Sequence, residues 1–370
     1  MKALFSKIRP QSGSTRAKRT DAPPPKLILH AGSQKTGTTS IQYVMSENRP
    51  YLDNVRVWYP PIYKYFPVKK NLQRARAHFA FANAVSSYTD DDRARIDAFL
   101  GAMKKNADRY DRVVLSAETL YRLFASDDGA VGESALDRRL RFLDRLAKLT
   151  ADFQPEVLLY LRRADRFAAS LYAEATVRRS TSQTFEEFLR AKGGRFNYRE
   201  RIDQFQRFFP TRVYGFEETA KAGLIDAFCS HAGIPGPLPD TPERPRPSVP
   251  NAAVLWLTRA KGERSGMTPV ERTHRWHFAL LPENAEMFEK DRKTVFWTDR
   301  AARDAFIEAN HAGVTEVSFP PVPDTIEPPA SWSDSQHADA EKRFFAWQKA
   351  NKAMLLKRRA KRIPPFVLDA

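Results

Sequence analysis

The sequence is short of residues that several classes of protein require. Cys229 is its one cysteine, which excludes an intrachain disulfide and a metal cluster held by thiols. No apolar run reaches the length of about 18 residues that a membrane-spanning helix needs. Residues 1–25 are basic but contain no long apolar stretch, so we do not expect a secretory signal. Together these absences favour a cytoplasmic protein.

Two segments near the ends of the chain contain basic residues but no acidic ones. Residues 1–20 carry six basic side chains and residues 342–362 carry nine, with no acidic side chain in either segment. These segments account for most of the formal net charge of +17, so the chain between them is nearly neutral. Such ends could bind an anionic polymer, but solvated tails are the simpler explanation. We therefore expect no specific nucleic-acid partner.

Short apolar runs alternate with helical patterns through the first two thirds of the chain. The runs predict five strands, at 26–32, 55–60, 112–118, 156–163 and 211–218. None shows the alternation of a half-exposed strand, which indicates burial on both faces. The pattern predicts an α/β fold with a mostly parallel central sheet flanked by helices.

Composition divides the chain into three parts. We predict a disordered basic tail at 1–25, one domain at 26–320 with its core at 26–235 and a helical or irregular extension at 236–320, and a proline-rich linker with a basic helix at 321–370. In that helix Phe344, Trp347, Met354 and Leu355 fall toward one side. This side could lie on an anionic membrane surface, or it could pack on the body of the protein.

A glycine- and hydroxyl-rich stretch, GSQKTGTTS at 32–40, joins the first predicted strand to a helix. Gly32 and Gly37 have the separation of a Walker A loop, G-x-x-x-x-G-K-[ST], but Thr38 stands where the lysine belongs. The lysine, Lys35, lies inside the loop instead. Backbone N–H groups at a helix N-terminus bind anions, and glycine lets the backbone approach them. The stretch predicts a phosphate-binding loop, with an ordinary capped turn as the alternative.

This loop resembles the 5′-phosphosulfate-binding loop, P-K-[ST]-G-T-[TS], of sulfotransferases that use 3′-phosphoadenosine 5′-phosphosulfate (PAPS), with Gln34 in place of the proline. The resemblance covers residues 26–235 and implies a P-loop-like sulfotransferase fold. It implies that the loop contacts the donor through Ser33, Gln34, Lys35, Thr36, Gly37, Thr38, Thr39 and Ser40.

The family also has an arginine near the end of a later strand and a serine eight residues further on. In LRRADRFAASLY, Arg162 and Ser170 have this spacing. The resemblance implies that both hold the 3′-phosphate of PAPS, with the guanidinium making a bidentate contact. The adjacent Arg163 is the alternative for the arginine.

Members of this family move a sulfuryl group to a hydroxyl or amine, release 3′,5′-ADP and need no metal for the chemistry. Lys35 would stabilise the charge on the departing oxygen. The base that takes the acceptor's proton would be Glu118, whose segment resembles that of glycan sulfotransferases, or His78 from an early helix.

The acceptor is predicted less directly. In its general sequence character the chain resembles bacterial family members, many of which act on carbohydrates. Residues 59–78 also combine tyrosines with lysines and arginines. We expect a glycan or glycolipid acceptor, although this strip also suits an exposed loop. Two other functions remain open: a P-loop kinase or NTPase, and a non-enzymatic protein that binds anionic polymers through its basic tails.

Overall fold

The computed structural model describes residues 23–67, 76–127, 129, 132–178, 183–240, 250–263, 267–289, 296–297, 299–322 and 333–355. The predicted N-terminal tail up to residue 22, part of the predicted acceptor strip and the last fifteen residues lie outside these ranges.

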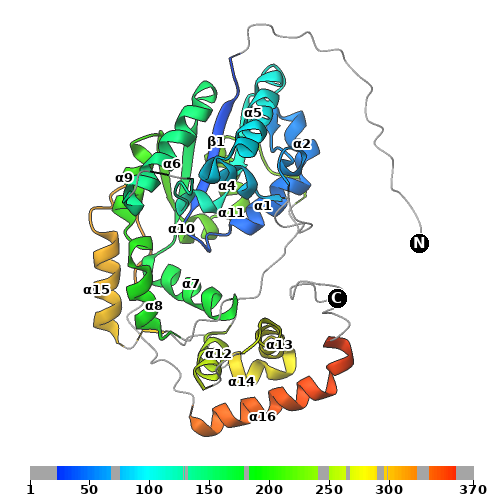
Figure 1. The fold of residues 1–370 in the computed structure, drawn as a ribbon, viewed down its shortest axis with the longest axis vertical. Coiled ribbons are helices and arrows are strands. Elements are labelled where there is room, and N and C mark those ends of the chain that lie inside the picture. Colours follow the sequence, from blue (N-terminus) through cyan, green and yellow to red (C-terminus); the bar gives the residue numbers. More distant parts are fainter. Residues whose placement is uncertain are drawn as a thin grey trace, which may run out of the picture.

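A five-stranded parallel sheet forms the centre of the molecule (Figure 1). Its strands, in the order β2-β3-β1-β4-β5, are β2 (Val57–Trp58), β3 (Arg112–Ser116), β1 (Lys26–Gly32), β4 (Glu156–Leu161) and β5 (Thr211–Gly215). All five predicted strands are present, and the predicted α/β class is confirmed. β2 is shorter than predicted, because Pro60 and Pro61 follow it and proline has no N–H to donate to a neighbouring strand.

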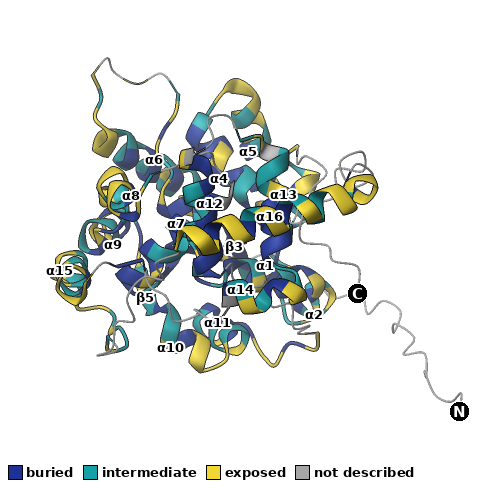
Figure 2. Cartoon of the chain, turned by 90° about the horizontal axis from the view of Figure 1, so that it is seen from below, coloured by how far each residue is buried: buried dark blue, intermediate teal, exposed yellow. Residues whose placement is uncertain are grey.

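Helices cover both faces of the sheet. One face carries α1 (Thr38–Glu47), α2 (Arg49–Asn54) and α11 (Leu224–Ala232), and the other carries α4 (Phe79–Ser87), α5 (Asp90–Lys105), α6 (Ala135–Thr150) and α9 (Tyr198–Gln206). In β1, Ile28 packs with Ile41 and Phe228 on the first face, and Leu27 and Leu29 join the core on the second. Burial on both faces explains why the strands are continuously apolar; Figure 2 shows this buried interior.

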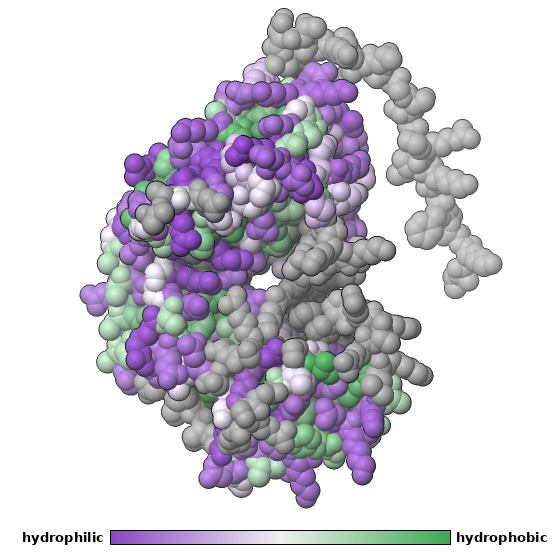
Figure 3. Space-filling model, in the orientation of Figure 1, coloured by the Kyte–Doolittle hydropathy of each residue, from purple (hydrophilic) through white to green (hydrophobic). Residues whose placement is uncertain are grey.

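Further helices extend the molecule beyond the sheet. They are α7 (Ala164–Arg178), α8 (Phe185–Lys192), α10 (Phe216–Lys221), α12 (Asn251–Glu263), α13 (Pro269–Ala279), α14 (Ala285–Glu289), α15 (Arg300–His311) and α16 (Asp334–Ala350). Figure 1 shows α12, α13, α14 and α16 grouped below the sheet. Hydrophilic residues cover most of the face seen in Figure 3, with apolar residues in smaller areas among them.

The basic C-terminal helix packs against its neighbours over the part that the structure describes. Phe344 of α16 is fully buried and contacts Trp256 and Phe278. The buried guanidinium of Arg275 in α13 pairs with Glu341 of α16 and stacks over the Phe344 ring at 4.4 Å. The extension and the C-terminal helix therefore share one core, and this part of α16 turns its apolar side toward the protein. Among the described helices, none combines the length and apolar character needed to cross a bilayer.

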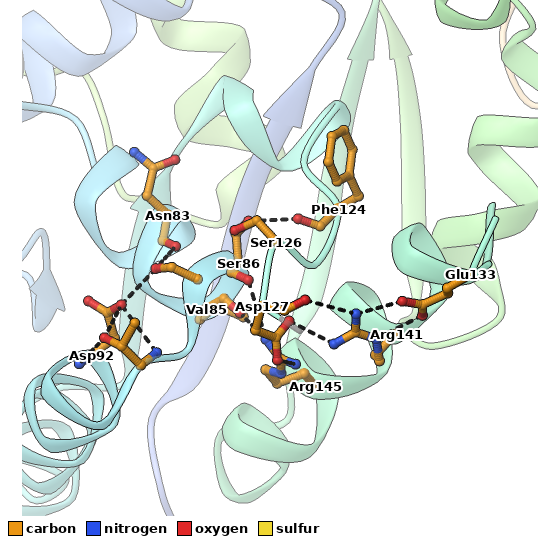
Figure 4. Close-up of polar contacts among 12 residues, drawn as sticks. Asn83, Val85, Ser86, Asp92, Phe124, Ser126, Asp127, Glu133, Arg141 and Arg145 are labelled. Atoms are coloured by element: carbon orange, nitrogen blue, oxygen red, sulfur yellow. Dashed lines mark hydrogen bonds and ion pairs between the residues drawn. The ribbon is translucent and has the colours of Figure 1, made fainter. Parts of the chain in front are cut away.

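Arginines of α6 fix the segment that follows β3. This segment opens with a short 3₁₀ helix, η2 (Glu118–Tyr121). Arg139 is buried and donates from Nη1 to the Leu120 carbonyl over 2.7 Å. Further along, Arg141 pairs with Asp127 at 2.7 Å, within the network of Figure 4. These bonds hold the segment at two points, Leu120 and Asp127. The chain that leaves the carboxyl end of β3 is therefore fixed in position.

Candidate functional site

The glycine- and hydroxyl-rich loop lies at the carboxyl end of β1, the central strand. β3 and β4 pair with β1 on opposite sides, and ligands of parallel sheets bind where the strand order reverses in this way. The Ser33 N–H donates to the Tyr160 carbonyl over 2.8 Å, and the Ser33 hydroxyl accepts the Arg162 N–H over 3.0 Å. The loop is thus attached directly to the end of β4.

Two loop residues brace the loop internally. Ser33 and Thr36 are fully buried, and the Thr36 hydroxyl donates to the Ser33 carbonyl over 2.9 Å. The Ser33 N–H is thus used as a donor within the protein, and the Ser33 hydroxyl serves as an acceptor for Arg162. Both residues therefore brace the loop, and the predicted contacts of Ser33 and Thr36 with the nucleotide stay predictions.

The middle of the loop carries a group of backbone N–H donors, which we call the donor surface. Lys35 has φ 72° and Gly37 has φ 67°, both in the left-handed region. The N–H groups of Lys35, Gly37, Thr38 and Thr39 make no hydrogen bond to another described residue. N–H groups that converge next to a helix N-terminus form a binding site for an anion. Glycine suits position 37 because φ is positive there, and a Cβ would meet the end of the Leu224 side chain at 2.4 Å, so that side chain would have to move.

The remaining predicted loop residues surround this surface. Gln34 is half-buried, with Oε1 buried and without a hydrogen-bond partner among the described residues. Thr39 is half-buried and Ser40 is exposed in the first turn of α1. Contacts of these residues with the nucleotide stay predictions.

Lys35 reaches from the loop to α7. Its Nζ lies 3.4 Å from Glu174 Oε2, and 38% of its side chain is exposed. The ammonium group is therefore accessible at the loop while a carboxylate partly neutralises it. An anion that displaced or shared this contact would find a positive charge beside the backbone donors.

The two adjacent arginines have different environments. Arg162 faces the loop and donates from Nη1 to the Lys35 carbonyl at 3.4 Å. Arg163 is buried, and its guanidinium makes two parallel bonds to Asp165, at 2.7 and 2.8 Å, besides donating to the Pro321 carbonyl. Of the two, Arg162 is the one placed at the loop, and Arg163 holds the chain after α15 onto the start of α7.

Ser170 lies on the side of α7 that faces the loop. Arg166, Ser170 and Glu174 are spaced by four residues, so they follow one another along a single face of the helix. Glu174 contacts Lys35, and Arg166 approaches Glu217 beside Arg162. Ser170 is half-buried and lies between these two contacts along the helix, and its contact with the 3′-phosphate stays a prediction.

Glu118 begins η2 at the end of β3, next to the loop helix. It is half-buried, and its Oε2 accepts the Thr38 hydroxyl over 2.7 Å. The structure thus joins two predicted site residues that are eighty positions apart in the sequence.

His78 is placed very differently. The ring is 1% exposed, its Nδ1 accepts the Ser116 N–H at 3.0 Å, and its Nε2 lies 3.1 Å from the Pro60 carbonyl. Burial lowers the pKa of His78 to about 3. Both ring nitrogens are occupied by the backbone, so no nitrogen is left to take a proton from a substrate. This geometry argues against the alternative in which His78 is the base.

Three charged residues of this site were not predicted from the sequence: Arg166, Glu174 and Glu217. Arg166 and Glu174 had a usable signal, because each is one helical turn from Ser170. Glu217 follows β5 at the same sheet edge as the loop, but nothing in the sequence indicates that it approaches Arg162.

The predicted acceptor strip is described only in part. Tyr63 is exposed, and Arg76 lies over the Tyr43 ring at 4.2 Å and 2.9 Å from Glu47. The lysines and arginine at 69–74 lie outside the described residues. A glycan-binding role for this strip stays a prediction.

Comparisons with known proteins add little to this geometry. No protein-family model and no curated protein matches the chain. Among solved structures, the chain is similar to a sulfotransferase from Alicyclobacillus acidocaldarius, with 18% sequence identity and a TM-score of 0.36, over 60% of this chain and 87% of that one.

Proposed function

We propose that this protein is a sulfotransferase that moves a sulfuryl group from PAPS to a hydroxyl or amine of an acceptor, with a glycan or glycolipid as the acceptor class. The observation that carries the proposal is the loop itself. Backbone N–H groups without partners, Lys35 inside the loop and Arg162 at its edge meet at the carboxyl end of the central strand.

The residues present suit a nucleotide with phosphate groups at two separate positions. The donor surface at Lys35, Gly37 and Thr38 would take the 5′-phosphosulfate. Arg162 and Ser170, on the next strand end and the helix after it, would take the 3′-phosphate. Guanidinium is suited to this task because its parallel N–H groups match two phosphate oxygens.

The proposed reaction is a direct transfer. The acceptor oxygen or nitrogen forms a bond to sulfur while the bond from sulfur to the 5′-phosphate oxygen breaks, and 3′,5′-ADP leaves. The Lys35 ammonium stabilises the negative charge on that oxygen. Glu118 takes the acceptor's proton, because it is a half-buried carboxylate beside the loop and His78 has no available nitrogen.

One observation favours a kinase or NTPase as the second candidate. Thr38 and Glu118 are hydrogen-bonded at the start of the loop helix, and a hydroxyl with a carboxylate could hold Mg²⁺ beside a nucleotide. Against this, Thr38 occupies the position that a Walker lysine would need. The two candidates therefore differ in the nucleotide that they bind and in whether a metal is needed.

Thermal melting with nucleotides separates these candidates. With metal removed by EDTA, 3′,5′-ADP should raise the melting temperature of a sulfotransferase, since ligands of the native state stabilise it. Mg-ATP should do so for a kinase. No shift with 3′,5′-ADP would refute our proposal, and a shift would justify an assay with radiolabelled PAPS over polysaccharide, lipid and small-molecule fractions.

A further inference from the structure

The face of α7 that carries Ser170 runs along the whole candidate site. At one end Glu174 lies 3.4 Å from Lys35, where the proposed function places the sulfuryl group. At the other end Arg166 Nη1 lies 4.0 Å from Glu217 Oε1, next to Arg162. Arg166 is therefore at the end of the site that would hold the 3′-phosphate, one helical turn from Ser170.

Glu217 links the two guanidinium groups at this end. It follows β5, only 10% of its side chain is exposed, and its Oε2 accepts the Arg163 N–H over 3.2 Å. Its Oε1 lies 3.7 Å from Arg162 Nε and 4.0 Å from Arg166 Nη1. The carboxylate thus lies between two cations without a short bond to either.

Buried Arg162 Nε and Glu217 Oε1 have no hydrogen-bond partner among the described residues. Their separation of 3.7 Å is slightly longer than a hydrogen bond. The terminal nitrogen Nη1 of Arg162 lies toward the loop instead, where it contacts the Lys35 carbonyl. A phosphate at the loop would bind the terminal nitrogens of Arg162. Arg162 Nε would then remain to donate to the buried carboxylate of Glu217.

Resting on the function proposed above, we propose that Arg166 and Glu217 complete the site for the 3′-phosphate. Arg166 contacts the phosphate as a second guanidinium. Glu217 is a positioning residue that orients Arg162 through Nε. Two arginines and one carboxylate leave a net positive charge, which suits a phosphate monoester carrying close to two negative charges at neutral pH.

Calorimetric titration with 3′,5′-ADP and with 5′-AMP, without metal, tests the role of Arg166. These ligands differ by the 3′-phosphate alone. Arg166→Ala should weaken 3′,5′-ADP binding by about tenfold and 5′-AMP binding by less than about twofold. The matched control is Arg343→Ala, which removes an exposed arginine with one carboxylate partner, Asp339, on α16. An unchanged preference in Arg166→Ala would overturn the role of Arg166.

The role of Glu217 is tested by two variants. Glu217→Ala removes both the charge and the acceptor for Arg162 Nε, and should weaken 3′,5′-ADP binding by about tenfold. Glu217→Gln keeps an acceptor oxygen and should recover part of this loss. Glu218→Gln, at the exposed neighbouring position, is the control. Tighter 3′,5′-ADP binding in both Glu217 variants would show a competing anion and overturn the positioning role.

The same titrations separate this inference from the proposed function. A wild-type protein that binds 3′,5′-ADP no better than 5′-AMP would refute both. A wild-type preference that all the Arg166 and Glu217 variants retain would refute only the inference. If Glu217→Ala does not fold, the other two variants decide the outcome. Glu217→Gln should fold because glutamine is nearly isosteric with glutamate, and Arg166→Ala should fold because Arg166 is exposed.

Discussion

The Thr38 hydroxyl donates to Glu118 Oε2 over 2.7 Å, and this bond joins the helix after the loop to the end of β3. It places a carboxylate beside the backbone donors that we assign to the phosphosulfate. The bond also fixes the orientation of that carboxylate, which a base must have to meet the acceptor.

Glu118→Gln should lower kcat by about 10²- to 10⁴-fold, because the amide cannot take the acceptor's proton. The affinity for 3′,5′-ADP should stay within about threefold, since Glu118 makes no contact with the nucleotide in our proposal. Single-turnover kinetics and calorimetry measure the two quantities. A variant that turns over normally would remove Glu118 from the base role.

Lys35→Ala should lower kcat by about 10²- to 10³-fold and change 3′,5′-ADP affinity much less, because the charge it stabilises develops mainly in the transition state. Lys148→Ala is the matched control, since Lys148 is an exposed lysine with one carboxylate partner on α6. If the affinity for 3′,5′-ADP fell and KM rose while kcat stayed unchanged, Lys35 would be a binding residue only.

The two adjacent arginines should respond differently to removal. Arg162→Ala should weaken 3′,5′-ADP binding by about 1.5–3 kcal/mol, roughly 10- to 150-fold, and leave stability nearly unchanged. Arg163→Ala should instead lower the free energy of unfolding by about 3 kcal/mol or more, because it leaves the Asp165 carboxylate buried and unpaired. Calorimetry and urea unfolding on both variants check this. The reverse pattern would exchange their roles.

Stability should fall in mild acid because of His30 and His78. Burial lowers both pKa values to about 3, well below the ordinary value of 6.5. As the pH drops below about 6.5, the unfolded chain takes up protons that the folded chain does not. Each histidine should then remove up to about 1.4 kcal/mol of unfolding free energy per pH unit.

Urea unfolding of wild type and His78→Gln at several pH values between about 7 and 5 tests this titration. The variant should show a shallower decline, by up to about 1.4 kcal/mol per pH unit, whatever its stability at neutral pH. Parallel declines would mean that His78 already binds a proton in the folded state.

Shortening the C-terminus should give two distinct results. Removal of 356–370 should leave the melting temperature and turnover of a small acceptor nearly unchanged. Removal of 342–370 should lower the melting temperature, since it deletes Phe344 from the core formed with α12 and α13. Circular dichroism and the transfer assay measure both. Loss of turnover on removing 356–370 alone would favour the hypothesis that the tails carry the function.

The sequence by itself determined the class of fold and the place of the loop. Nearly continuous apolar runs such as KLILHAG predict buried strands, since a strand covered on both faces does not alternate apolar and polar residues. The glycine and hydroxyl pattern at 32–40 predicts an anion-binding turn because these residue types permit the backbone geometry and supply the donors.

Only the tertiary structure decided which polar residues face the candidate site and which are bonded within the protein. Sequence spacing cannot show that Arg163 pairs with Asp165 while Arg162 faces Lys35, because both arginines follow the same strand. It also cannot show that both ring nitrogens of His78 are used by the backbone. Such assignments depend on contacts between segments far apart in the chain, whose burial and distances are fixed by the packing of helices on the sheet.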